Sequence, residues 1–227
     1  MKSITNFNGM VPMIDSKDAV MLLIDHQSGL FQCVHDMPMM RLRDHAVALA
    51  KAATLVNIPV ITTASVPQGP NGPLIPEIHE IAKHAKYVAR KGEINAWDCE
   101  DFVKAVKETG RKTLIIAGTV TSVCLALPAI SAVAEGYKVF AVIDASGTYS
   151  KMAEEVSTAR MLQAGVIPID TAAVIAELQH TWNRKDADVW AEEVWPKIFV
   201  NYRLLLESYA KTKSVIENKE ILDSERK

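Results

Sequence analysis

TLIIAGTVTSVC, residues 113–124, carries the clearest architectural signal of the chain. Its apolar first half stops at Gly118 and is typical of a buried parallel strand. The residues after Cys124, from Leu125 to Gly136, are small and apolar and end in a glycine, as in a packed helix. A buried strand that leads directly into a helix is the repeating unit of parallel α/β folds.

The same alternation continues through most of the chain. Hydrophobic patterning predicts strands near 19–25, 58–63, 87–89, 113–118, 137–143 and 166–169. It predicts helices near 40–57, 100–109, 125–136, 152–164 and 172–182. Alternation of this kind implies right-handed crossovers and a parallel sheet with helices on both faces. The expected fold is a Rossmann-like three-layer α/β/α sandwich.

Composition narrows the class of protein. The 227 residues suit one large α/β domain, and 25 Lys and Arg against 27 Asp and Glu give no electrostatic reason to expect nucleic acid. Three cysteines without paired spacing favour a reducing compartment. No apolar run approaches the roughly 18 residues of a membrane span, and the first 17 residues lack a signal-peptide core. We therefore expect a cytoplasmic protein without membrane contact.

The pattern divides the chain into an N-terminal arm (1–17), an α/β domain (18–182) and a C-terminal helical extension (183–227) that becomes highly charged after Lys211. Between Trp190 and Tyr209 the extension carries too many aromatic and aliphatic residues for a free tail. We expect this segment to contact a neighbouring subunit in a homo-oligomer. The alternative is that it folds back over its own domain.

Three reactive side chains follow predicted strands. Asp25 follows the first strand, Arg90 or Lys91 the third, and Cys124 the fourth. Ligands of open parallel sheets bind outside the carboxyl ends of the strands, so an acid, a cation and a thiol should meet there. Taken singly, a cysteine is more often a small apolar filler. Together the three predict a nucleophile activated by a base.

The position of Cys124 also predicts its ionisation. A thiol on the first turn of a helix lies at the positive end of the helix dipole, which favours the thiolate. A nearby cation would add to this effect. We therefore expect a lowered pKa for Cys124.

Five segments resemble the isochorismatase-like cysteine hydrolases, and within them the YcaC-like group of uncertain substrate. Three signature regions match, namely residues 25–27 (DHQ), 90–98 (RKGEINAWD) and 118–124 (GTVTSVC). Two further matches are residues 68–74 (QGPNGPL) and 144–148 (DASGT). The similarity extends from about Asp18 to beyond Tyr202.

This resemblance implies a six-stranded parallel sheet and an Asp–basic–Cys triad that forms a covalent thioester-type intermediate. Asp25 would be the general base and Cys124 the nucleophile, in a hydrolase of small amide, carbamoyl or ester-type substrates. The pattern R-x-G-x-I-N-A-W assigns the cation to Arg90, with Lys91 as the alternative. The YcaC-like relatives are commonly octameric, which agrees with a homo-oligomer.

The resemblance also implies an oxyanion hole. It would rest on a cis peptide bond at Thr119–Val120, or one residue later, with the N–H groups of Val120 and Cys124 as donors. Four side chains are candidate substrate contacts, although core packing would explain them equally well; they are Gln27, Phe31, Asn95 and Trp97.

Related nicotinamidases carry an Asp-x-His-x-x-His metal site after the second strand. Residues 62–68 of this chain contain no histidine, and His79 and His84 are five apart, a poor spacing for one helix face. His26 follows Asp25, but strand alternation turns it away from the triad. We expect neither a metal nor a cofactor.

Two other classes of protein compete with the hydrolase. A thiol redox protein could use Cys124, but no C-x-x-C motif accompanies it. A catalytically silent oligomer of the same fold is the other alternative. The intact acid, cation and thiol argue against such a loss of activity.

Overall fold

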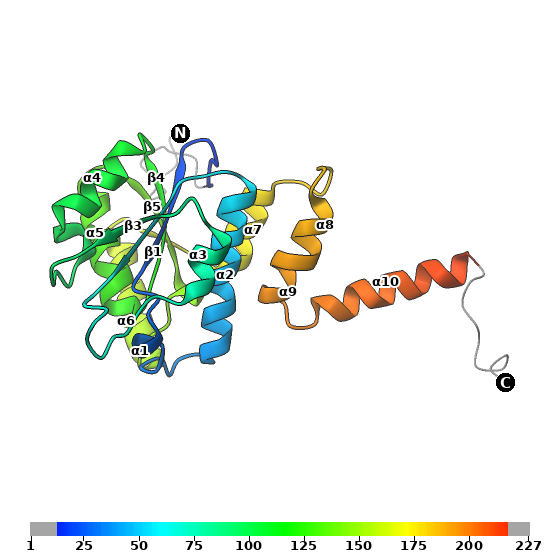
Figure 1. The fold of residues 1–227 in the computed structure, drawn as a ribbon, viewed down its shortest axis with the longest axis horizontal. Helices are drawn as coiled ribbons and strands as arrows, with labels where there is room; N and C mark the ends of the chain where they lie inside the picture. The colour runs from blue at the N-terminus through cyan, green and yellow to red at the C-terminus, as the bar shows by residue number, and fades with distance from the viewer. Residues whose placement is uncertain (1–12, 218–227) are drawn as a thin grey trace.

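A six-stranded parallel sheet forms the centre of the structure, a computed structural model that describes residues 13–217 (Figure 1). The strand order is β3-β2-β1-β4-β5-β6. The strands are β1 (Ala19–Ile24), β2 (Val60–Ala64), β3 (Lys86–Ala89), β4 (Thr113–Gly118), β5 (Lys138–Val142) and β6 (Ile167–Ile169). The three-layer fold expected from the sequence is confirmed. Residues 1–12 of the expected arm and 218–227 of the charged tail lie outside the described residues.

Helices connect the strands and cover both faces of the sheet. They are α1 (Ser28–Phe31), α2 (Met39–Leu55), α3 (Pro76–Ile81), α4 (Glu100–Glu108), α5 (Ala126–Ala134), α6 (Lys151–Gln163), α7 (Thr171–Gln179), α8 (Ala187–Val189), α9 (Trp195–Ile198) and α10 (Tyr202–Ile216). Residues 13–217 also contain two 3₁₀ turns, η1 (Ala96–Asp98) and η3 (Ile143–Ala145), and two π-helical turns, η2 (Thr121–Leu125) and η4 (Trp190–Val194). No helix in the range 13–217 has the length and apolar character needed to cross a bilayer.

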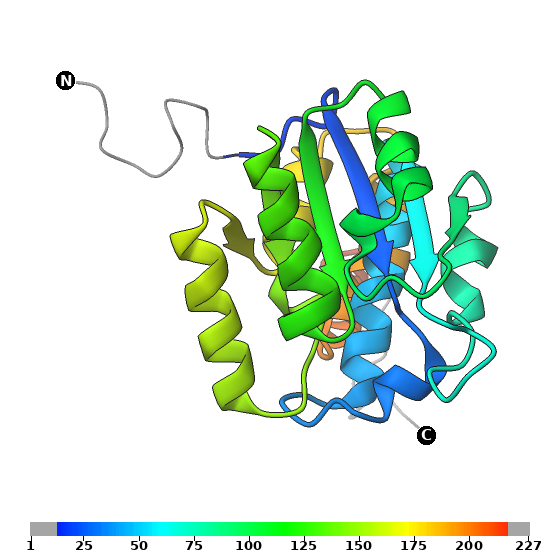
Figure 2. The same cartoon turned by 90° about the vertical axis from the view of Figure 1, so that its left-hand side faces the viewer.

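Strand β1 shows why the sheet has two cores. All six of its residues are buried, and they alternate between the faces. Met21 and Leu23 pack in the core under α2 and α7, whereas Leu22 and Ile24 pack in the core under α4 and α5 (Figures 1 and 2). A fully buried parallel strand of this kind explains the uninterrupted apolar runs in the sequence.

The register aligns the strand ends that carry the predicted site. Ile24 pairs with Thr63 on one side and with Gly118 on the other. Ala64 of β2 pairs with Ala89 of β3. The residues that follow β1, β3 and β4 therefore leave the sheet along one edge.

The C-terminal extension divides into two parts. Trp190, Val194 and Ile198 are buried in the same core as α2, so this portion folds back over its own domain, as in the alternative given above. Helix α10 instead projects away from the body (Figure 1), and none of its residues is buried. The expected contact with a neighbouring subunit is thus restricted to the residues after Ile198.

Candidate active site

Asp25 is the first residue beyond β1 and is completely buried. Its N–H donates to the carbonyl of Thr63 over 3.0 Å, and its φ of 57° turns the chain out of the sheet. This left-handed backbone is uncommon for a residue with a side chain, and aspartate is among the types that tolerate it. Strained residues of this kind concentrate at functional sites.

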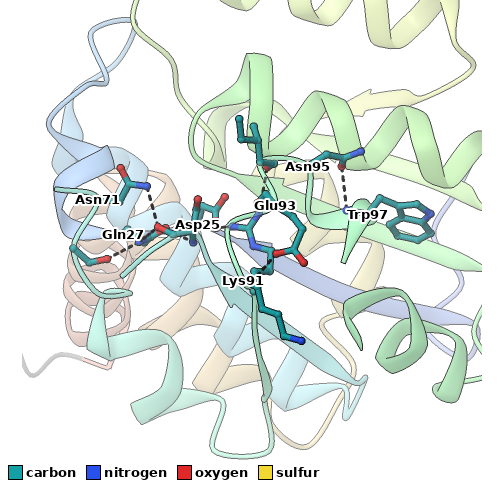
Figure 3. Close-up of polar contacts among 11 residues, drawn as sticks. Asp25, Gln27, Asn71, Lys91, Glu93, Asn95 and Trp97 are labelled. Carbon is teal, nitrogen blue, oxygen red and sulfur yellow. Dashed lines mark hydrogen bonds and ion pairs between the residues drawn. The ribbon is translucent and has the colours of Figure 1, made fainter. Parts of the chain in front are cut away.

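Arg90 lies opposite Asp25, directly after β3. Its Nη2 donates to Asp25 Oδ1 in an ion pair in which both side chains have no exposed surface. Its Nη1 donates to the carbonyls of Glu93 (2.9 Å) and Ile94 (3.2 Å), which fix the plane of the guanidinium. Lys91 is exposed and points away from Asp25 (Figure 3). The structure therefore brings Arg90, and not Lys91, to the carboxylate.

Cys124 lies in the π-helical turn η2, which joins β4 to α5. Its thiol lies close enough to the Asp25 carboxylate for each group to shift the pKa of the other. The residue is only 6% exposed. Asp25 Oδ2 makes no hydrogen bond of ordinary length and angle within residues 13–217, while the Cys124 thiol and the N–H of Ser65 both lie near enough to the carboxylate to lower its pKa. The acid, cation and thiol predicted from the sequence thus lie together.

Close packing at Gly118 and hydrogen bonds to the segment after β5 hold the turn η2 in place. A Cβ on Gly118 would lie 2.6 Å from the carbonyl oxygen of Cys124, a contact that only glycine allows. Ser146 Oγ accepts a hydrogen bond from the N–H of Gly118 (3.0 Å), and the carbonyl of Gly147 accepts from Thr121 N–H and Oγ1. The sequence marked 144–148 as a motif but gave it no such role.

Ionisation of the thiol differs from the sequence-based expectation. Burial raises the pKa of Cys124 well above the ordinary value, and the adjacent Asp25 carboxylate raises it further. The prediction of a lowered pKa was wrong, because desolvation and a neighbouring negative charge outweigh the helix end. Burial also raises the pKa of Asp25, against the opposing effect of Arg90. The resting thiol is therefore protonated at neutral pH and needs a base.

The peptide bond between Thr119 and Val120 is cis, as the resemblance implies. One of the two expected oxyanion donors is occupied, since the N–H of Cys124 donates to the carbonyl of Val120 over 2.9 Å. The N–H of Val120 faces the sulfur of Cys124, where it opposes the rise in the thiol pKa. Two buried hydroxyls near this edge of the sheet, on Thr63 and Thr119, have no hydrogen-bond partner among residues 13–217. Such groups in an active site serve to bind substrate or water.

Comparison with known proteins identifies the family. Residues 19–173 match the model of the isochorismatase domain. The chain belongs to the isochorismatase family. It is 45% identical over 196 residues to the probable hydrolase YcaC of Escherichia coli strain K12, covering 86% of this chain and 93% of that protein. The family resemblance read from the motifs is confirmed, and this member of the family is a hydrolase.

Two solved structures share the fold closely. The YcaC gene product of Escherichia coli, described as an octameric hydrolase of unknown specificity, has a TM-score of 0.83 at 44% identity, covering 88% of this chain and 97% of that one. YcaC from Pseudomonas aeruginosa, with hexane-2,5-diol and covalent acrylamide, has a TM-score of 0.82 at 43% identity, covering 87% and 97%.

Two of the candidate substrate residues of this isochorismatase-family chain have partners within the protein. The amide of Gln27 donates to the carbonyls of Ser65 and Gly72 and accepts from the N–H of Ser65, so it holds the 65–72 loop (Figure 3). Phe31 is buried in the core on the α2 side of the sheet, with its ring edge-on to His26. Cys124 packs in the core on the other side. Both residues thus have structural roles.

Asn95 and Trp97 also have structural partners. Asn95 caps η1 by accepting from the N–H of Trp97 (3.0 Å; Figure 3). The indole N–H of Trp97 donates to Glu135 (2.8 Å). Glu135 ends α5, eleven residues from Cys124, or about 16 Å along a helix. This placement does not support a contact between Trp97 and a substrate carbonyl at Cys124.

The histidines take structural positions as well. His26 is fully buried beneath the site, its Nε2 lies 2.8 Å from the carbonyl of Ala145, and burial lowers its pKa to about 4. His79 contacts the hydroxyl of Thr62 over 3.0 Å. Across residues 13–217, no three His, Cys, Asp or Glu side chains gather as a metal site.

Proposed function

We propose that this hydrolase is a cysteine hydrolase that cleaves a small amide, carbamoyl or ester-type substrate through a covalent intermediate on Cys124. The observation that carries the proposal is the buried Asp25 carboxylate, which is paired with Arg90 through Oδ1 and lies close to the Cys124 thiol. The raised pKa of the thiol makes a positioned base necessary.

In the first half-reaction, Asp25 takes the thiol proton as the sulfur attacks the substrate carbonyl carbon. The resulting oxyanion accepts a hydrogen bond from the N–H of Val120. As the intermediate collapses, Asp25 returns the proton to the departing nitrogen or oxygen, and a thioester remains on Cys124. In the second half-reaction, Asp25 takes a proton from water, which attacks the thioester, and the thiol leaves with that proton.

Arg90 keeps the base in place throughout the cycle. Its guanidinium is held by two backbone carbonyls and stays charged, so it fixes the position of Asp25 Oδ1. It also opposes the effect of burial on the Asp25 pKa, and thereby keeps the carboxylate able to accept a proton.

The P. aeruginosa relative supports nucleophilic chemistry, because its structure contains covalent acrylamide, an electrophilic amide. We test the proposal with a turnover screen of small amides, carbamoyl compounds and esters, and with intact-mass measurement after acrylamide treatment. Turnover and an adduct on Cys124, both absent from Cys124→Ala and both retained in Cys33→Ser, are expected. Turnover by Cys124→Ala would contradict the proposal. Reversible oxidation of Cys124 without hydrolysis would indicate a redox protein.

We further propose that the chain forms a homo-oligomer. The E. coli relative at 44% identity is octameric, and the apolar residues of α10 are exposed in the single chain. Light scattering should give a multiple of the 25.0 kDa chain mass at micromolar concentration. A 25 kDa particle would contradict this assembly.

A further inference from the structure

Helix α10 carries apolar side chains that no other residue in the range 13–217 covers. It projects from the body, and five of its large apolar residues are 52–75% exposed: Leu204, Leu205, Tyr209, Val215 and Ile216 (Figure 1). An isolated helix of fifteen residues is marginally stable in water, so most such helices are stabilised by packing of an apolar face. Helix α10 therefore requires a partner surface.

The exposed apolar residues lie on one face. With 3.6 residues per turn, a single arc of about 140° contains only uncharged side chains. We call it the α10 face, and its members are Leu204, Leu205, Ser208, Tyr209, Thr212, Val215 and Ile216. All charged residues of the segment lie outside the arc; they are Arg203, Glu207, Lys211, Lys213 and Glu217.

The α10 face is nearly symmetric about the level of Ala210. Reversing the helix at that level places Leu204 opposite Ile216, Leu205 opposite Val215, and Ser208 opposite Thr212. Bulky apolar pairs thus fall at both ends and small hydroxyl residues near the middle, where Tyr209 of one copy falls level with Lys211 of the other. A surface that matches its own reversed copy is what a two-fold interface between identical chains requires.

Charge supports the same arrangement. Glu207 and Lys211 lie beside one edge of the α10 face, one helical turn apart. In an antiparallel pair, that edge of one helix meets the same edge of the other, so Glu207 of each copy comes near Lys211 of its mate. Two opposite-charge contacts would then flank the apolar centre.

Aromatic contacts anchor the N-terminal end of α10 to the body. The ring of Trp195 stacks on Phe199 with centroids 5.5 Å apart and planes at 2°, and it lies 6.3 Å from the ring of Tyr202. Trp195 itself packs against the core. The start of α10 is therefore attached to the body, while every member of the α10 face is exposed among the described residues.

We propose that the α10 face packs antiparallel against the α10 face of a second copy of this chain, about a two-fold axis level with Ala210. This inference rests on the proposed homo-oligomer and is independent of the proposed chemistry at Cys124.

The first test compares two matched double variants by light scattering of the full chain. Leu205→Glu with Val215→Glu places two charges on the α10 face, whereas Ala210→Glu with Ser214→Glu places them on the opposite side. The first variant should have at most half the wild-type particle mass, and the second should retain the wild-type mass. If the first variant keeps the wild-type mass, the α10 interface is refuted while the homo-oligomer stands. A monomeric wild type would refute both.

The second test determines the direction of the helices. Ser208→Cys and Thr212→Cys chains, both carrying Cys33→Ser, are co-expressed and oxidised. The antiparallel pair predicts a disulfide between the two different chains. Disulfides between identical chains would indicate parallel helices, and the lack of any cross-link would indicate that the α10 face docks elsewhere; either result overturns the proposal.

Discussion

The carboxyl edge of the sheet and helix α10 differ in how far their side chains find partners within the described part of the chain. At the sheet edge, the side chains of Asp25 and Arg90 have no exposed surface, and they neutralise each other within one chain. In α10 no residue is buried, and the apolar side chains face outward. This difference underlies both proposals: a single chain assembles the proposed catalytic groups, whereas its C-terminal helix is proposed to pack against a second chain. Substitutions at the edge should change chemistry and folding, and substitutions in α10 should change association.

The largest effect on activity is expected from substitution of Asp25, the proposed general base. Asp25→Asn keeps the shape of the side chain but removes proton acceptance, so turnover of a substrate found in the screen should fall by at least ~10³-fold. The measurement is kcat on purified protein whose circular dichroism matches the wild type. An active Asp25→Asn enzyme would show that another group takes the thiol proton.

The two neighbouring cations should differ strongly in their effect on stability. Arg90→Met leaves the Asp25 carboxylate buried without its partner and should lower the free energy of unfolding by about 3–5 kcal/mol. Lys91→Met removes an exposed side chain and should change it by no more than about 0.5 kcal/mol. Urea unfolding of both variants measures the difference. Equal losses would mean that the buried ion pair contributes little.

The raised pKa of Cys124 predicts how its reactivity depends on pH. In a Cys33→Ser background, the iodoacetamide rate should be low at neutral pH and should keep rising beyond about pH 8.5, where an ordinary thiol is half ionised. Because the Asp25 charge opposes ionisation of the thiol, Asp25→Asn should shift the profile to lower pH. A wild-type profile centred below that of a small free thiol would restore the expectation based on the helix dipole.

The smallest effect on the stability of the body is expected from removal of α10. A chain ending at Val200 loses no buried residue of that helix, so the stability of the body should change by no more than about 1 kcal/mol, while the assembly loses mass. Trp190→Ala is the contrasting variant, because it empties a fully buried site and should cost about 3–5 kcal/mol. Thermal unfolding at matched particle concentration compares them. A strongly destabilised truncation would show that α10 supports its own body.

Local pattern was sufficient to predict the strands and the convergence of Asp25, a basic residue after the third strand, and Cys124. The apolar runs have the length and composition of buried strands, and parallel topology brings their ends to one edge. The choice of Arg90 over Lys91 came from the family pattern, and the ion pair with Asp25 now supplies a physical reason for it.

Three features depend on tertiary burial, which the sequence does not display. The ionisation of Cys124 is governed by the lost solvent around it. The amide of Gln27 is used by a loop that begins about 40 residues later. The apolar segment from Trp190 to Tyr209 is divided at Ile198, because only its first part fits against α2. Hydrophobicity alone indicates that such a segment is covered, but it does not identify the surface that covers it.

The most direct test of the account is to trap the intermediate itself. Wild-type protein is mixed with a small activated ester, quenched in acid within milliseconds to seconds, and analysed by intact-mass and peptide mass spectrometry. We predict an added acyl mass on Cys124 that disappears as the ester is consumed and that is absent from Cys124→Ala. Ester hydrolysis at the wild-type rate with no acyl mass on Cys124 at any time would contradict the assignment of Cys124 as nucleophile.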